Sequence, residues 1–149
     1  MKTISKLCWL ALLLTQAYTG KAQRERPVRP YLFEHCSQKI PAPVAVLDKA
    51  FAATAGNTVK FMFAPGFEFS GTVISSVQKY NNLASVLVKS PALNNALLSI
   101  SRRINDDHTI TYAGRIINEN YADAYELVKD PSGNYSFTKI RTEELIQDF

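Results

Sequence analysis

The chain has 149 residues, of which 46% are apolar and 20% charged, and its formal net charge is +4. This length fits a single domain with enough apolar side chains for one packed core. The composition excludes a disordered tail, a collagen-like repeat and a disulfide-rich miniprotein, which need a depleted core, periodic glycine or many cysteines.

Residues 1–22 have the pattern of a secretory signal peptide. Two lysines precede an apolar run of eight residues at 7–14, and a more polar stretch then ends in small residues at Ala22. A membrane-spanning helix needs about 20 apolar residues, so a retained anchor is the weaker alternative for this short run. We expect secretion or periplasmic export with cleavage after Ala22, Ala17 being the weaker alternative, and no membrane span in the mature chain.

Removal of the leader changes the charge of the protein. The leader contains three lysines and no acidic residue, so the mature chain carries 14 basic and 13 acidic residues, a net charge of +1. Nucleic-acid binding requires a clustered excess of Lys and Arg to neutralise phosphates. Nucleic acid is therefore not an expected partner.

The mature chain starts with a proline-containing arm at 23–43, followed by a single domain at 44–149. Prolines favour an extended chain in the arm, where four of the seven occur. Residues 44–55 are expected to be helical, because Pro43 suits a helix start and apolar residues recur at intervals of three and four. A short helix is expected at 142–148, with Thr142 as its N-cap.

Between Thr58 and Ile140, apolar and polar residues alternate, as is typical of strands with one buried face. Clusters of Asn, Asp, Gly and Pro separate the runs. The seven expected strands are 58–63, 67–77, 83–89, 96–104, 109–118, 121–129 and 135–140. The fold class is therefore α+β: an N-terminal helix packed on a seven-stranded antiparallel meander, as a curved sheet or a small barrel.

Two connections allow sharper predictions. Pro65-Gly66 favours a type II turn, so we expect a connection wider than a two-residue hairpin, or a bend, there. If 118–120 is a three-residue hairpin loop, Arg115 lies opposite Asp123 and forms a cross-strand ion pair. The same register places Gly114 opposite Ala124, a small pair that leaves room for a large side chain or a ligand.

The candidate chemistry is sparse. His108 follows two aspartates, but metal-ligand spacing is missing, so a solvated turn is the favoured interpretation and neither metal nor cofactor is expected. Cys36 is the one cysteine of the mature chain. The favoured interpretation is a buried thiol, and a reactive or intermolecular thiol is the alternative. A row of Tyr112, Tyr121 and Tyr125 would resemble a carbohydrate-binding or protein-binding surface if exposed, although packing at the core rim is the commoner outcome.

These observations lead to three function hypotheses. The first is an exported, non-enzymatic binding or protein-interaction module, whose partner is a protein, a glycan or a small apolar ligand. The second is a carrier that holds a small apolar ligand inside a barrel, with Gly114 and Ala124 lining the space. The third and weakest is a hydrolase that uses Cys36.

Overall fold

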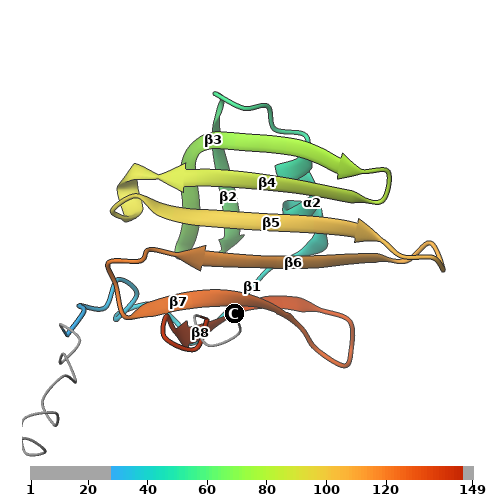
Figure 1. The fold of residues 1–149 in the computed structure, drawn as a ribbon. Coiled ribbons are helices and arrows are strands. Elements are labelled where there is room, and N and C mark those ends of the chain that lie inside the picture. The colour runs from blue at the N-terminus through green and yellow to red at the C-terminus, as the bar shows by residue number, and fades with distance from the viewer. Residues whose placement is uncertain (1–27, 146–149) are drawn as a thin grey trace, which may run out of the picture.

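The structure is a computed structural model that describes residues 28–145, so the expected leader at 1–22 lies outside the described residues. The described chain forms an eight-stranded antiparallel sheet with one α-helix and a short 3-10 helix (Figure 1). In chain order the elements are β1 (Lys39–Pro41), α2 (Val44–Phe51), β2 (Thr58–Ala64), β3 (Phe67–Tyr80), β4 (Leu83–Ser90), η2 (Pro91–Leu93), β5 (Ala96–Ile104), β6 (Ile110–Ile117), β7 (Asp123–Lys129) and β8 (Tyr135–Arg141).

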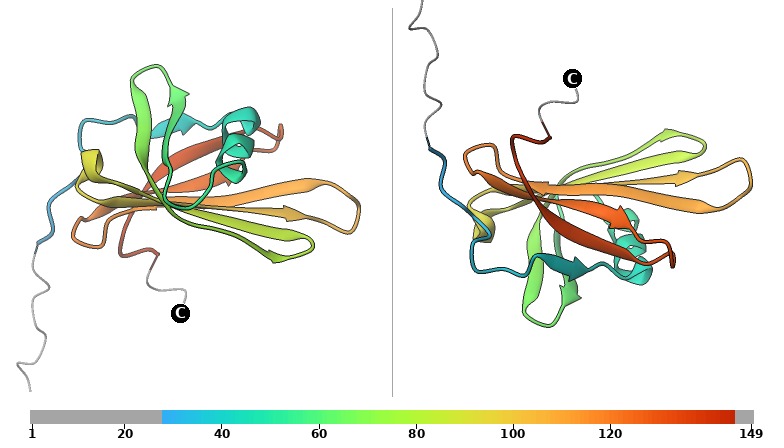
Figure 2. Two further views of the ribbon diagram at one scale, coloured as in Figure 1. Left: turned by 90° about the horizontal axis from the view of Figure 1, so that it is seen from above. Right: turned by 90° about the horizontal axis from the view of Figure 1, so that it is seen from below.

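The sheet is a meander in which each strand from β2 to β8 pairs with the next strand along the chain. The expected antiparallel sheet is confirmed, and its seven predicted strands are all present. The eighth strand, β1, pairs with β8 and was not expected. The two edge strands β1 and β2 approach each other, so the sheet curls into a nearly closed, barrel-like shape (Figure 2).

β1 lies in the stretch that we expected to be an arm. Ile40 is buried, and the neighbouring Pro41 is tolerated because β1 is an edge strand, where a missing backbone N–H breaks no ladder. Upstream of β1, Phe33 is also fully buried and packs edge-on against the ring of Tyr125, with 4.9 Å between ring centroids. This stretch therefore contributes Phe33 and Ile40 to the same core as the rest of the described chain.

The helix α2 begins at Val44 as expected but ends earlier than residue 55. After Phe51 the chain is captured by β3: the Gly56 N–H donates to the Val73 carbonyl, and the Val73 N–H donates to the Asn57 carbonyl. These tertiary hydrogen bonds satisfy backbone groups that a longer helix would have used. Leu47 and Ala50 are buried, so α2 covers the inner face of the sheet.

The helix expected at 142–148 is not shown. Residues 142–145 form a turn, and 146–149 lie outside the described residues. Thr142 is buried, where its N–H donates to the Ala122 carbonyl and its hydroxyl donates to the Tyr121 carbonyl. The threonine that we expected to cap a helix therefore ties the chain end to the start of β7.

The core fills the inside of the curled sheet. Alternate residues of each strand point inwards, as expected for a pleated sheet with one buried face. Phe63 and Phe137 meet across the interior at 5.0 Å, and Phe67 packs against Tyr125 at 5.8 Å, both edge-on. The large inward side chains of the cluster are Phe33, Leu47, Phe61, Phe63, Phe67, Phe69, Val73, Val86, Val88, Leu98, Ile100, Tyr112, Ile116, Tyr125, Leu127, Tyr135 and Phe137.

The connection between β2 and β3 is tighter than expected. It has two residues, Pro65 and Gly66, and Gly66 has a φ of 85°, which suits the third position of a type II turn. A register shift between Met62 and Ala64 lies directly beside this turn. The bulge changes the local twist, which is the physical reason why a two-residue connection is possible here.

Candidate functional site

The predicted pairing of β6 with β7 is wrong. Arg115 lies opposite Glu126 and not opposite Asp123, so the predicted ion pair does not form. The cause is the connection at 118–122, which is held by other parts of the chain and cannot form a three-residue hairpin loop. The Ala122 N–H donates to the Pro30 carbonyl, and the Ala122 carbonyl accepts from Thr142.

The space that we expected beside Gly114 is also absent. The register does not pair Gly114 with Ala124, and Ala124 lies opposite Ile140 on β8. A Cβ atom on Gly114 would lie 2.7 Å from the carbonyl oxygen of Ser99. Glycine is therefore needed for the close approach of β5 and β6, and the Ser99 carbonyl occupies the space into which a side chain at this position would extend.

The three tyrosines do not form an exposed row. Tyr112 is 8% exposed and Tyr125 is fully buried, whereas Tyr121 is half-buried. The Tyr112 hydroxyl donates to Asp48 at 2.6 Å, and the Tyr125 hydroxyl donates to the Ser37 carbonyl at 2.6 Å. Burial raises the pKa of both phenols well above the usual value, with further contributions from Asp48 at Tyr112 and from Cys36 at Tyr125.

Asp123 has a structural partner that the sequence did not indicate. Its carboxylate is buried and accepts the backbone N–H groups of Leu32 at 2.7 Å and Phe33 at 2.9 Å. From β8, the Lys139 ammonium donates to the carbonyl oxygens of Phe33 and Cys36. These side chains lock the segment around residues 30–37 across one end of the sheet, and this is the role that the structure shows for them.

Cys36 lies in that locked segment and is half-buried. With His35 and Lys39 it lines a small hollow of about 250 Å³. His35 and Cys36 lie in a turn, where the Cys36 N–H donates to the Phe33 carbonyl. Within residues 28–145 no hydrogen bond joins the His35 imidazole to the Cys36 thiol, so the hollow does not show the paired nucleophile and base that a cysteine hydrolase requires.

His108 occupies a solvated hairpin turn, as favoured from the sequence. Its φ is 62°, and its N–H donates to the Asn105 carbonyl at 2.9 Å. Asp107 accepts hydrogen bonds from the hydroxyl and N–H of Thr109, which lower the pKa of its carboxyl group. Within residues 28–145, no group of three or more His, Cys, Asp or Glu side chains lies close enough to hold a metal ion.

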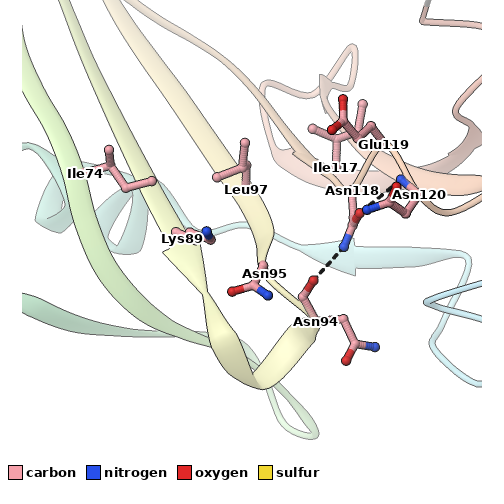
Figure 3. Close-up of a pocket in the computed structure, with 9 residues that line it drawn as sticks. All are labelled: Ile74, Lys89, Asn94, Asn95, Leu97, Ile117, Asn118, Glu119 and Asn120. Carbon is pink, nitrogen blue, oxygen red and sulfur yellow. Dashed lines mark hydrogen bonds between the residues drawn. The ribbon is translucent and has the colours of Figure 1, made fainter.

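The strongest candidate site is a groove on the outer face of the sheet, the face that points away from the core. It has a volume of about 590 Å³ and is open to solvent. Its floor is a row of apolar side chains, Ile74 of β3, Leu97 of β5 and Ile117 of β6, with the Lys89 stem between Ile74 and Leu97 (Figure 3). The register explains the row, because Leu97 lies opposite Lys89 on one side and Ile117 on the other.

The rim of the groove is rich in amides. Two loops contribute to it: the η2–β5 connection supplies Asn94 and Asn95, and the β6–β7 connection supplies Asn118, Glu119 and Asn120. In a meander, alternate connections lie at the same end of the sheet, which is why these two loops meet. Side-chain amides both donate and accept hydrogen bonds, so this rim can match a ligand with mixed polar groups.

Hydrogen bonds between the two loops hold the rim in place. The Asn118 side chain is buried and donates to the Asn94 carbonyl at 2.7 Å, while its oxygen accepts the Asn120 N–H at 3.1 Å (Figure 3). The Asn94 side chain donates to the Tyr121 hydroxyl at 3.0 Å. Asn94 and Asn95 both have positive φ, a conformation that asparagine tolerates better than most residues. The rim is therefore organised before any ligand binds.

We interpreted these asparagines from the sequence only as turn residues. The sequence does contain one signal for the rim, because asparagines are frequent in two alternate connections of the predicted meander. Alternate connections of a meander lie at the same end of the sheet. The apolar floor had no such signal, because Leu97 and Ile117 lie on the solvent side of strands whose inner side is also apolar.

No protein-family model, curated protein or solved structure matches the chain. None of the helices within residues 28–145 is long and apolar enough to span a membrane.

Proposed function

We propose that this protein is an exported, non-enzymatic interaction module that binds a polypeptide segment in the outer-face groove. The observation that carries the proposal is the combination of an apolar floor with an organised ring of amides, in a groove of about 590 Å³. An apolar side chain of a partner fits such a floor, and its backbone amides match the Asn rim. Export rests on the leader pattern at 1–22.

A polypeptide is favoured over a glycan because the groove offers no aromatic platform. Its floor consists of aliphatic side chains, and the rings of Tyr112 and Tyr125 are in the core. The alternative of a carrier that holds a small apolar ligand inside the sheet has little support from the geometry. It depended on free space at Gly114, which the Ser99 carbonyl occupies, and the inward side chains pack together inside the sheet.

The proposal is tested with an array of random-sequence peptides, probed with the mature protein. The comparison protein carries Leu97→Gln and Ile117→Gln, which replace two floor side chains with polar ones of similar size. We expect peptides selected by the wild type to lose about tenfold or more in affinity with this variant, because their apolar anchor loses its contact.

Val128→Gln is the matched control, since Val128 is an exposed apolar residue of β7 outside the groove. It should bind the selected peptides as the wild type does. The proposal is wrong if no peptide binds, or if binding is equally strong with the floor variant. A glycan array probed in parallel with the same proteins tests the alternative ligand class.

A further inference from the structure

The second half of β3 has a free edge. β3 runs over 14 residues, but β2 pairs with it only as far as Thr72, and Asn57 then bonds to Val73. From Ile74 to Tyr80 the strand pairs with β4 on one side, and within the described chain no strand pairs with its other side. The turns of the β3–β4 and β5–β6 hairpins project beyond α2 and the rest of the sheet (Figure 2).

Two irregularities bring the apolar residues of this edge to one face. Register shifts lie between Val73 and Ser75 and between Gln78 and Tyr80, so Ile74 and Lys79 are extra residues in the ladder. Tyr80 consequently lies opposite Leu83, on the same outer face as Val77. Without the second shift, a period of two would turn Tyr80 to the inner face.

The resulting apolar stripe consists of Ile74, Val77 and Tyr80, and all three are exposed. The exposed fractions of Ile74, Val77 and Tyr80 are 49%, 52% and 62%. The stripe is continuous with the groove, because Ile74 is also part of the groove floor (Figure 3). Unpaired backbone N–H and C=O groups along such a strand form a template for another strand.

Basic residues surround the stripe on the outer face. Lys79 lies on the edge strand itself with its ammonium 5.9 Å from the Tyr80 ring centroid, and Lys89, Arg103 and Arg115 lie at exposed outer positions of β4, β5 and β6. Arg115 faces Glu126 across the ladder, whereas the other three have no acidic residue opposite them in the register. A partner with acidic residues complements this charge.

We propose that the free edge of β3 from Ser75 to Tyr80 binds an extended acidic segment of another polypeptide as an added strand. The added strand forms backbone hydrogen bonds with β3, its apolar side chains cover Val77 and Tyr80, and its acidic side chains approach Lys79. This inference rests on the proposed function, since it identifies the polypeptide as a strand whose end enters the groove at Ile74.

A second copy of this chain fits the edge less well. A lysine on an edge strand is one feature by which proteins prevent their own edges from pairing. A paired copy would bring its own Lys79 and outer-face cations to an already basic surface. The same lysine that opposes self-pairing favours an acidic partner.

The test uses three synthetic peptides of eight residues added to the isotope-labelled mature protein. One has threonine at every second position and valine and glutamate in turn at the positions between, so that valine and glutamate lie on the same face of the added strand. The second has the same sequence with N-methyl groups on alternate amides, and the third has lysine in place of glutamate. We expect the acidic peptide to shift the amide resonances of residues 75–80, and the other two to bind about tenfold more weakly or worse. Lys79→Glu should weaken the acidic peptide, and Lys49→Glu, an exposed lysine on α2, should not.

Equal binding of the N-methylated or lysine peptide would overturn the proposal, as would shifts that avoid residues 75–80. A dimer in sedimentation that Lys79→Glu alters would also overturn it, in favour of a second copy. Shifts confined to Leu97, Ile117 and the Asn rim would overturn the edge proposal while leaving the proposed function intact. Resonance shifts at residues 75–80 that persist in the variant carrying Leu97→Gln and Ile117→Gln would support the edge proposal and show that binding does not need the groove.

Discussion

Asp123→Ala is expected to be among the most destabilising single substitutions in the chain. The buried carboxylate accepts two short backbone hydrogen bonds, from Leu32 at 2.7 Å and Phe33 at 2.9 Å. Removing it leaves the buried Phe33 N–H and the half-buried Leu32 N–H without an acceptor. Hydrogen bonds to a charged group are worth about 1.5–3 kcal/mol each, so a loss of about 3–6 kcal/mol is expected for the two.

Such a loss is a large part of the stability of a small domain, which is about 5–15 kcal/mol. Urea unfolding of the mature protein, followed by circular dichroism, measures it directly. Asp130→Ala is the matched control: Asp130 also accepts a backbone N–H, from Asn134 at 2.9 Å, but it lies at an exposed hairpin turn. Its effect should be much smaller because water replaces the lost acceptor.

The reasoning would be refuted if both alanine variants lost similar, small amounts of stability. Water would then be reaching the Leu32 and Phe33 N–H groups, and the segment at 30–37 would not be locked by Asp123. Asp123→Asn distinguishes charge from shape, because the amide keeps one acceptor oxygen but presents an N–H₂ group to the second donor. It should fall between the wild type and Asp123→Ala.

Three further outcomes follow from the structure. Because burial raises the phenol pKa of Tyr125 in the folded state, stability should be complete below about pH 10 and decrease as the pH rises above it; urea midpoints across this range should decrease less steeply for Tyr125→Phe. Gly114→Ala should cost about 1–3 kcal/mol in the same urea assay, since its Cβ would meet the Ser99 carbonyl, and an unchanged midpoint would show that β5 and β6 can separate freely. Cys36→Ala should leave peptide affinity within about twofold of the wild type, whereas loss of binding would assign the thiol a part in recognition.

Sequence reasoning succeeded where the signal is local. The alternation through Phe61, Phe63 and Phe69 follows from the pleat of a strand, and each of these side chains is in the core. The start of α2 at Val44 likewise follows from Pro43 and the apolar spacing. The turn at His108 follows from the local hydrogen bonding of Asn and Asp.

The parts that sequence reasoning missed depend on contacts between distant segments. β1 exists because β8 offers an edge to Lys39–Pro41, and α2 ends early because Val73 bonds to the chain that follows it. The candidate site belongs to this class. Its rim joins two loops, and its floor joins four strands through a register that no single strand encodes.

The number and order of the strands from β2 to β8 follow from the sequence alone, since a period of two is a property of each segment. The register of β6 and β7 depends on contacts that exist only in the folded protein. The Asp123 carboxylate is held inside by the N–H groups of Leu32 and Phe33, and Ala122 is hydrogen-bonded to Pro30 and Thr142. The connection at 118–122 therefore cannot form the three-residue hairpin loop that the sequence predicts. The bulges of β3 likewise become visible only in its pairing with β4, and they turn Ile74, Val77 and Tyr80 to one outer face and create the surface on which the proposed binding rests.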